Sequence, residues 1–244
     1  MNLWLKSESD EPGLASSKKQ PRICVSIAVR GSLALITRKA QEAIDYGADM
    51  VEIRLDYLDR VNVPLLRRYL TGLENRLILT CRKRDEGGRF GGSEKERVRI
   101  LTEIAEWDGP MLDIELSTIQ RNSTLFKSKS ENIIISWHDF KRTPGRPILL
   151  RKVEEAMQLG GIAKIVTTAR NVTDNATILS LYKASHKGSL IAFCMGEKGM
   201  ISRILSPMVG SPLAYTFFGS NPVVPGQFSL DEFRDLYGIM SLGT

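Results

Sequence analysis

The chain has 244 residues, of which 42% are hydrophobic and 25% are charged, and its formal net charge is +6. This length and composition are typical of one large globular domain or two small ones. No apolar run approaches the roughly 20 residues that a membrane-spanning helix needs. The first twenty residues lack the ordered charged, apolar and small-residue regions of a signal peptide. We therefore expect no membrane partner and a cytoplasmic location.

The basic residues are scattered along the chain, without a long basic block or interleaved aromatic residues. This pattern argues against nucleic acid as a partner, whereas a basic protein can attract an anionic metabolite. The three cysteines, Cys24, Cys81 and Cys194, are well separated and lie in apolar runs. Their placement favours buried reduced thiols over a disulfide framework or a metal site.

Residues 1–20 are rich in Ser, Lys, Glu and Asp and predict a flexible N-terminal extension. Over residues 21–244, short β-branched runs alternate with longer stretches of helical period. The short runs predict strands at 22–29, 50–56, 76–82, 111–117, 132–138, 163–169, 189–195 and 213–219.

Helical patterns fill the gaps between these runs, and only the gap at 117–128 gives a weak one. Ser93-Glu94-Lys95-Glu96 is a capping box, and Gly47 and Gly160 stand where helices should end. The predicted helices are 33–46, 63–73, 93–107, 146–159, 174–186, 199–208 and 229–239. This alternation predicts an α/β fold, a single-domain (β/α)₈ TIM barrel over residues 21–244. A doubly wound sheet is the rival, but no Gly-rich phosphate-binding sequence follows the first strand.

Polar side chains share one face of several predicted strands. In the second strand, Glu52, Arg54 and Asp56 alternate with apolar residues. Because the helices pack on the apolar face, the charged face should point into the barrel. The same pattern recurs at Thr80 and Arg82, Asp113 and Glu115, Ser136 and His138, and Lys164 with Val166 and Thr168. Since unpaired buried ions are costly, we interpret this set as a site at the C-terminal ends of the strands.

Three residues in this region suggest chemical roles. His138, in Ser136-Trp137-His138-Asp139-Phe140, is one of only two histidines and could act as an acid or base near neutral pH. The alternative is a structural histidine bonded to the backbone. Lys164, in an apolar segment, could attack a carbonyl as a neutral amine, and the alternative is a salt-bridged lysine. Arg203, in the first turn after Gly199, could join free helix N–H groups in binding a carboxylate.

Two glycine-containing loops follow predicted strands. Residues 83–92 carry Glu86-Gly87-Gly88, and residues 219–227 end with Pro225-Gly226-Gln227. Both are suited to cover a pocket at the strand ends, although glycines there also serve in plain turns.

From about residue 22 to residue 239, the chain resembles the type I 3-dehydroquinate dehydratase family, the Schiff-base-forming enzymes of the shikimate pathway. The motifs that carry the resemblance are Lys164, His138, Glu52-x-Arg54-x-Asp56, Arg82 with Glu86-Gly87-Gly88, Ser202-Arg203 and Pro225-Gly226-Gln227. The resemblance implies conversion of 3-dehydroquinate to 3-dehydroshikimate and water, with no metal and no cofactor. We also expect a homodimer.

The resemblance implies a role for each matching residue. Lys164 matches the lysine that forms an imine with the substrate ketone, and arginines clustered near it should favour its neutral form. His138 matches the histidine that takes the C2 proton and protonates the departing C1 hydroxyl, and Glu86 matches the acid that orients it. The implied substrate-binding residues are Glu52, Arg54 and Arg82 for the ring hydroxyls, and Arg203 and Gln227 for the carboxylate.

The chain departs from the family pattern at three positions. Val223 stands where serine or threonine is usual, so one hydrogen bond to the carboxylate is missing or is replaced, for example by Ser220. Trp137 stands where a smaller aromatic residue is common, and Cys81 where phenylalanine is common. None of these departures removes a chemical role.

Other functions remain open on the sequence alone. A class I aldolase-like lyase would also use a lysine on the sixth strand. It would need a phosphate pocket, and Met195-Gly196-Glu197-Lys198-Gly199 is only weakly phosphate-like. A non-catalytic binder of an acidic metabolite would have no need of both His138 and Lys164. A nucleic-acid role rests on charge alone.

Overall fold

The computed structural model describes residues 21–126, 132–186, 188–220 and 222–241. The predicted extension at 1–20 lies outside the described residues. Within them, no helix is long and apolar enough to cross a membrane.

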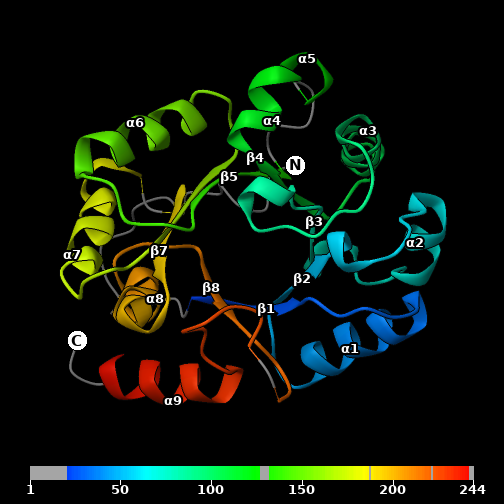
Figure 1. Ribbon diagram of the computed structural model, residues 1–244. Coiled ribbons are helices and arrows are strands. Elements are labelled where there is room, and N and C mark those ends of the chain that lie inside the picture. Colours follow the sequence, from blue (N-terminus) through cyan, green and yellow to red (C-terminus); the bar gives the residue numbers. More distant parts are fainter. Residues whose placement is uncertain (1–20, 127–131, 187, 221, 242–244) are drawn as a thin grey trace, which may run out of the picture.

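Eight parallel strands form a nearly closed barrel with helices around it (Figure 1). They pair in the order β7-β6-β5-β4-β3-β2-β1-β8, so that consecutive strands are neighbours and β1 pairs with β8. No pairing joins β7 to β8 among the described residues. The strands are β1 Arg22–Ile27, β2 Met50–Arg54, β3 Leu77–Thr80, β4 Met111–Glu115, β5 Ile133–Asp139, β6 Ile162–Thr168, β7 Leu190–Met195 and β8 Leu213–Thr216. The predicted TIM barrel is confirmed.

Helices follow the strands around the outside of the barrel. They are α1 Leu33–Asp45, α2 Val63–Tyr69, α3 Glu94–Ala105, α4 Leu116–Arg121, α5 Ser123–Phe126, α6 Arg146–Met157, α7 Asp174–Leu179, α8 Met200–Met208 and α9 Leu230–Ser241. The hydroxyl of Ser93 accepts from the N–H of Glu96 at 3.2 Å, as the capping box predicts. The weak helix expected at 117–128 consists of the short helices α4 and α5. The helix predicted at 174–186 is shorter, because a 3₁₀ helix, Ser180–Ala184, follows α7.

The strands β2 and β3 end two residues earlier than their apolar alternation suggests. β2 stops at Arg54, and a 3₁₀ helix, Leu55–Tyr57, takes the chain out of the barrel. Asp56 therefore does not continue the inward face of β2, as the alternation predicted. Its buried carboxylate instead accepts hydrogen bonds from Arg54 at 2.8 Å and from the backbone N–H groups of Arg82 and Arg89 at 3.2 and 2.9 Å. Asp56 thus joins the ends of β2 and β3 to the loop that follows β3.

The interior of the barrel changes from apolar to polar along the strands. Its floor takes one buried residue from each strand: Cys24, Met50, Ile78, Met111, Ile134, Ile162, Ile191 and Leu213. Because side chains on one face recur every second residue, the next inward residues are Ser26, Glu52, Thr80, Asp113, Ser136, Lys164, Phe193 and Tyr215, all buried. The apolar floor closes the barrel below, and the polar layer above it forms the base of a pocket at the C-terminal ends of the strands.

The three cysteines are buried and free, as the sequence predicts. Cys24 belongs to the interior floor, whereas Cys81 and Cys194 pack in the larger core between the strands and the outer helices.

Candidate active site

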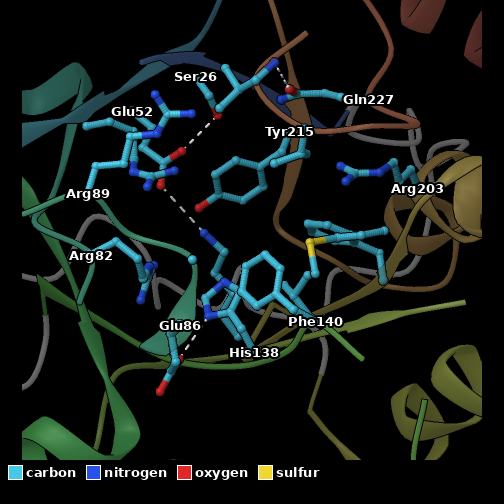
Figure 2. A pocket seen from close by; sticks show the side chains of 18 of the residues that line it. Ser26, Glu52, Arg82, Glu86, Arg89, His138, Phe140, Arg203, Tyr215 and Gln227 are labelled. Carbon is cyan, nitrogen blue, oxygen red and sulfur yellow. Dashed lines mark hydrogen bonds and ion pairs between the residues drawn. The ribbon is translucent and has the colours of Figure 1, made fainter. Parts of the chain in front are cut away.

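A cavity of about 220 Å³ lies at the C-terminal ends of the strands (Figure 2). The structure brings all eight predicted site residues to its wall: Glu52, Arg54, Arg82, Glu86, His138, Lys164, Arg203 and Gln227. They come from four strands or strand ends, from α8 and from two loops. The alternating polar faces of the strands therefore converge on one place, as expected for a TIM barrel.

The Lys164 ammonium lies between two carboxylates. Its Nζ donates to Asp113 Oδ2 at 2.9 Å and lies 3.6 Å from Glu52 Oε1. The same atom lies 4.0 Å from the ring centroid of Tyr215. Arg82, one of the arginines that line the same cavity, binds the other oxygen of Asp113. The effect expected of these arginines on the charge of Lys164 stays a prediction. In the resting site, Lys164 is a buried, ion-paired lysine beside an aromatic face.

Glu52 is held in place on both sides by hydroxyl groups. Ser26 Oγ donates to one of its oxygens at 2.8 Å, and Thr80 Oγ1 donates to the other at 2.9 Å. Burial acts to raise the pKa of Glu52, but the positive charges of Lys164 and Arg54 outweigh it and leave the pKa below its ordinary value. Glu52 is therefore a fixed carboxylate that faces the cavity.

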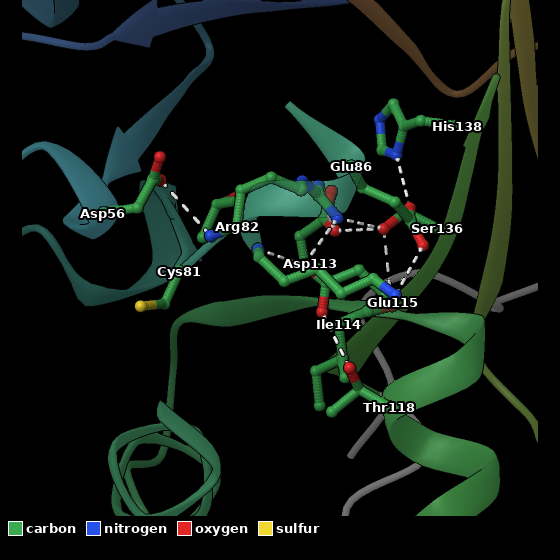
Figure 3. Close-up of polar contacts among 12 residues, drawn as sticks. Asp56, Cys81, Arg82, Glu86, Asp113, Ile114, Glu115, Thr118, Ser136 and His138 are labelled. Carbon is green, nitrogen blue, oxygen red and sulfur yellow. Dashed lines mark hydrogen bonds and ion pairs between the residues drawn. The ribbon is translucent and has the colours of Figure 1, made fainter. Parts of the chain in front are cut away.

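Arg82 and Asp113 form the centre of a buried polar network (Figure 3). Arg82 donates to Asp113 and to Ser136 Oγ, each at 2.6 Å, and Ser136 Oγ donates to Asp113 at 2.6 Å. The guanidinium also lies 3.3 Å from Glu115. Burial would raise the pKa of Asp113, but Arg82 and Lys164 hold it well below its usual range. Asp113 thus fixes Arg82 and Lys164 relative to each other.

His138 reaches the cavity from the end of β5 and contacts the loop after β3. Its Nδ1 lies 3.1 Å from Glu86 Oε2, which fixes the direction of the other ring nitrogen. Burial, together with the charges of Arg82 and Lys164, lowers the pKa of His138 well below 6.5. The imidazole is therefore neutral near pH 7 and able to accept a proton.

Glu86 is placed by the two glycines that follow it, and at both positions any larger residue would force a rearrangement. Gly87 has φ +76°, and a Cβ there would lie 2.3 Å from the ring of Phe140. A Cβ on Gly88 would lie 1.9 Å from the carbonyl oxygen of Arg82. The Glu86-Gly87-Gly88 sequence thus folds the loop tightly over the end of β3 and directs the carboxylate at His138. Burial raises the pKa of Glu86, against the positive charges of Arg82 and Lys83.

Arg203 supplies a buried cation on the side of the pocket opposite Arg82 and Arg89 (Figure 2). Its guanidinium lies 4.5 Å from the ring centroid of Phe193, and its Nε and one terminal nitrogen lack partners among the described residues. Burial lowers the pKa of Arg203 to about 10, so the group remains charged at neutral pH. The N–H of Ser202 bonds to Asn175 Oδ1 at 3.0 Å, so this helix N–H does not join Arg203 as the sequence suggested.

The loop after β8 lines the pocket and is held by hydrogen bonds between the Gln227 side chain and backbone groups. Gln227 donates to the carbonyl of Thr216 at 2.9 Å and accepts from the N–H of Val223 at 3.1 Å. Val223 lines the cavity, whereas Ser220 is exposed and is not one of the lining residues. Gly226 has φ +75°, and a Cβ there would lie 2.4 Å from the carbonyl oxygen of Gly196. Gln227 therefore holds the loop in shape as well as facing the pocket.

An aromatic ring in contact with two arginines forms the wall beside β2. The guanidinium groups of Arg54 and Arg89 lie 5.2 and 4.8 Å from the ring centroid of Tyr57. Both arginines line the cavity. Cation–π contacts of this kind help hold charged side chains in place.

Sequence reasoning gave no role to several residues of this site. Asp113 was expected to face inward, but its bonds to both Arg82 and Lys164 depend on the register of β3 to β6. Tyr215 and Phe193 lie on inward positions of β8 and β7, which the period-two rule could have found. Tyr57 ends a short 3₁₀ helix and Arg89 lies in a loop, so no strand periodicity indicates the direction of either side chain.

Comparisons with known proteins agree on one family. The sequence model of a family described as type I 3-dehydroquinase matches residues 23–244. The 3-dehydroquinate dehydratase of Methanothermobacter thermautotrophicus is 33% identical over 217 residues, covering 89% of this chain and 96% of the relative. That of Methanocaldococcus jannaschii is 32% identical over 225 residues, covering 90% and 99%. The solved type I enzyme of Clostridium difficile, with covalently modified comenic acid, has a TM-score of 0.79 at 25% identity and covers 92% and 94% of the two chains.

Proposed function

The chain belongs to the type I 3-dehydroquinase family, and from this premise we propose which of its residues carry out the reaction. The reaction is the conversion of 3-dehydroquinate to 3-dehydroshikimate and water through a lysine Schiff base. The aldolase-like and non-catalytic alternatives are thereby excluded. The observation that carries our assignment is that Lys164 and a neutral His138, from neighbouring strands, open into the same cavity.

Lys164 is the nucleophile. The Lys164 ammonium first gives a proton to the neutral imidazole of His138, and the neutral amine then attacks the substrate ketone. The imidazolium protonates the hydroxyl of the resulting carbinolamine, which leaves as water, and a protonated imine remains. The positive imine draws electrons from the adjacent C2–H bond and makes that proton acidic. Asp113 and Glu52 then neutralise the imine charge from the positions in which they hold the ammonium.

His138 moves the protons. Its neutral ring takes the C2 proton, and the imidazolium formed then protonates the departing C1 hydroxyl, so that one group serves as base and acid. Glu86, at 3.1 Å from Nδ1, holds the ring in the tautomer that presents the other nitrogen to the cavity and stabilises the imidazolium.

Arg203 binds the substrate carboxylate. Two of its buried nitrogens have no partner among the described residues, and a guanidinium can donate two parallel hydrogen bonds to a carboxylate. Both points support this role. Gln227 donates one amide N–H to Thr216, and its second amide N–H also binds the carboxylate. Glu52, Arg54 and Arg82 bind the ring hydroxyls from the other side. The substrate thus lies across the pocket, with its carboxylate on α8 and its ketone at Lys164.

The ultraviolet absorbance of the conjugated product tests this assignment. We expect the wild-type protein to produce enone absorbance from 3-dehydroquinate, and Lys164→Arg to lose activity by about 10⁴-fold or more, because the guanidinium cannot form the imine. Lys152→Arg, at a half-buried lysine of α6 that does not line the cavity, is the matched control and should keep full activity. Turnover by Lys164→Arg near the wild-type rate would reject the role of Lys164.

We further propose that the enzyme is a homodimer that works in the cytoplasm. An apolar groove between α8 and α9 supports the dimer, since Ile201, Leu236 and Ile239 are 50%, 39% and 69% exposed beside it. The buried free thiols support a reducing compartment. Sedimentation should give twice the 27.3 kDa chain mass, and Ile239→Lys should shift it toward the monomer. A monomeric wild-type protein at micromolar concentration would contradict the dimer.

A further inference from the structure

Tyr215, on β8, brings a phenol hydroxyl to the pocket that none of the described residues satisfies. The residue is 8% exposed, and its hydroxyl oxygen is buried without a hydrogen-bond partner in the described part of the chain. Leaving a buried hydroxyl unpaired costs free energy that a bonded partner would recover. The residue also lines the cavity. A substrate oxygen can therefore supply the missing partner.

The position of the ring indicates which part of the substrate the hydroxyl meets. The ring centroid lies 4.0 Å from Lys164 Nζ. Figure 2 shows the hydroxyl of Tyr215 directed away from Arg203 and into the space between Glu52 and His138. The hydroxyl therefore lies on the side of the nucleophile, opposite the guanidinium assigned to the carboxylate.

We propose that the Tyr215 hydroxyl donates a hydrogen bond to the ketone oxygen of the substrate while Lys164 attacks the ketone carbon. When the bond from Nζ to carbon forms, the π pair of the carbonyl moves onto this oxygen. The oxygen then takes a proton from the positively charged nitrogen of the adduct and becomes the carbinolamine hydroxyl. It leaves as water when the imidazolium of His138 supplies a second proton. A donor aimed at the developing negative charge lowers the barrier to the first step. This inference rests on the proposed imine at Lys164.

The environment keeps Tyr215 a donor rather than a base. Burial raises its pKa well above 10, so the phenol stays protonated at neutral pH. The face of the ring has a separate effect, because an aromatic ring near a cation stabilises both the ammonium of Lys164 and the iminium that replaces it. Phenylalanine would keep this ring effect and remove only the hydroxyl, so Tyr215→Phe isolates the hydrogen bond.

Single-turnover trapping of the imine tests the inference. Enzyme and saturating 3-dehydroquinate are mixed, quenched with borohydride at successive times, and the adduct is measured by intact mass. We expect Tyr215→Phe to slow imine formation by about 10- to 100-fold, somewhat less than the loss of a full oxyanion-hole donor. Its urea unfolding midpoint without substrate should equal or exceed that of the wild type, because the variant buries no unpaired hydroxyl. Tyr69→Phe, at an exposed tyrosine, is the control and should leave both quantities unchanged.

Two results would overturn the inference while leaving the proposed function intact. One is imine formation at the wild-type rate in Tyr215→Phe. The other is weaker substrate binding with an unchanged rate at saturation, which would mean that the hydroxyl binds a different substrate oxygen. Failure of the wild-type protein to form any adduct would instead reject the imine chemistry of Lys164, and this inference with it.

Discussion

The imidazole of His138 lies in the pocket wall, where burial and the charges of Arg82 and Lys164 hold its pKa well below the ordinary 6.5. Glu86 contacts one ring nitrogen and leaves the other toward the cavity. A neutral, oriented imidazole next to an amine nucleophile is suited to move protons in both directions during one turnover.

Replacement of His138 by glutamine should separate the two chemical stages. His138→Gln keeps a polar side chain but cannot exchange the C2 proton, so we expect kcat to fall by about 10²- to 10⁴-fold. Some imine at Lys164 should still be trapped by borohydride. His186→Gln, at the other histidine, which is exposed, is the control. Wild-type turnover by His138→Gln would show that another group moves the proton.

The lowered pKa of His138 is directly measurable, because the chain has only two histidines. In an NMR titration, His186→Gln removes one imidazole signal and assigns the other to His138. A depressed pKa means that the neutral form persists as the pH falls through 6.5, so the midpoint should lie below that value. The acidic side of the pH profile of kcat/KM should show the same midpoint, since this parameter reports the ionisation of groups in the free enzyme. A midpoint at or above 6.5 would contradict the burial argument.

At the same scale, strand alternation predicted site residues only on regular strands, whereas Glu86 and Gln227 were predicted from the family resemblance. Alternation placed Glu52, Lys164 and His138 on inward faces, and the structure agrees. The contact of Asp113 with both Arg82 and Lys164 was not predicted, because alternation along one strand does not show which carboxylate each cation meets. This contact depends on the pairing of β3 with β4 and of the strands that follow. The direction of Asp56 was missed because the strand gives way to a 3₁₀ turn.

At the scale of elements, the loop after β8 depends on close backbone packing at Gly226 against Gly196. The backbone N–H of Gly196 also donates to the carbonyl of Pro225 at 3.1 Å. This contact ties the loop to the end of β7, and it places Val223 and Gln227 at the pocket. The sequence located the loop but not this contact, because contacts between distant backbone segments leave no local pattern.

Gly226→Ala should therefore displace the loop. The change imposes both a left-handed backbone on alanine and a clash with the Gly196 carbonyl. We expect a loss of about 2–3 kcal/mol of unfolding free energy and a raised KM. Gly219→Ala is the matched control, because Gly219 has φ +98° but no atom within 4 Å of the added Cβ. It should cost only about 1–2 kcal/mol and leave KM near the wild-type value. Equal effects of the two changes on KM would argue against loop packing as the cause.

At the scale of the whole molecule, the barrel combines an apolar floor with a layer of buried ions that belongs to several strands. The alternation of strands and helices was sufficient to predict this architecture, because eight β/α units have few other compact arrangements. The missing pairing between β7 and β8 among the described residues was not predictable, since register across a closure depends on the tilt of all the strands.

Asp113→Asn tests how far the ion layer stabilises the molecule. The carboxylate neutralises Arg82 and Lys164, and breaking a buried ion pair typically costs about 3–5 kcal/mol. We expect a loss of about 3 kcal/mol at pH 7, because Glu115 and Glu52 still contact the two cations. The pKa of Asp113 is depressed in the folded state, so this contribution is present above its unfolded pKa of 3.8 and is lost as the pH falls.

Urea unfolding of both proteins at pH 7 and near pH 3 measures this difference. The difference in unfolding free energy between the wild type and Asp113→Asn should become smaller at the lower pH. Glu42→Gln removes an exposed ion pair with Arg38, and it should change stability by less than about 0.5 kcal/mol. A difference that grows at the lower pH would contradict charge as the contribution of Asp113.

The most direct test of the central claim is to locate the imine. Wild-type protein is incubated with 3-dehydroquinate, reduced with borohydride, weighed as the intact protein and then digested. Because the amine of Lys164 is the proposed nucleophile, we predict one adduct per chain, on the peptide that contains Lys164. Lys164→Arg should give none. An adduct on another lysine, or no adduct in a wild-type sample that forms product, would contradict the account.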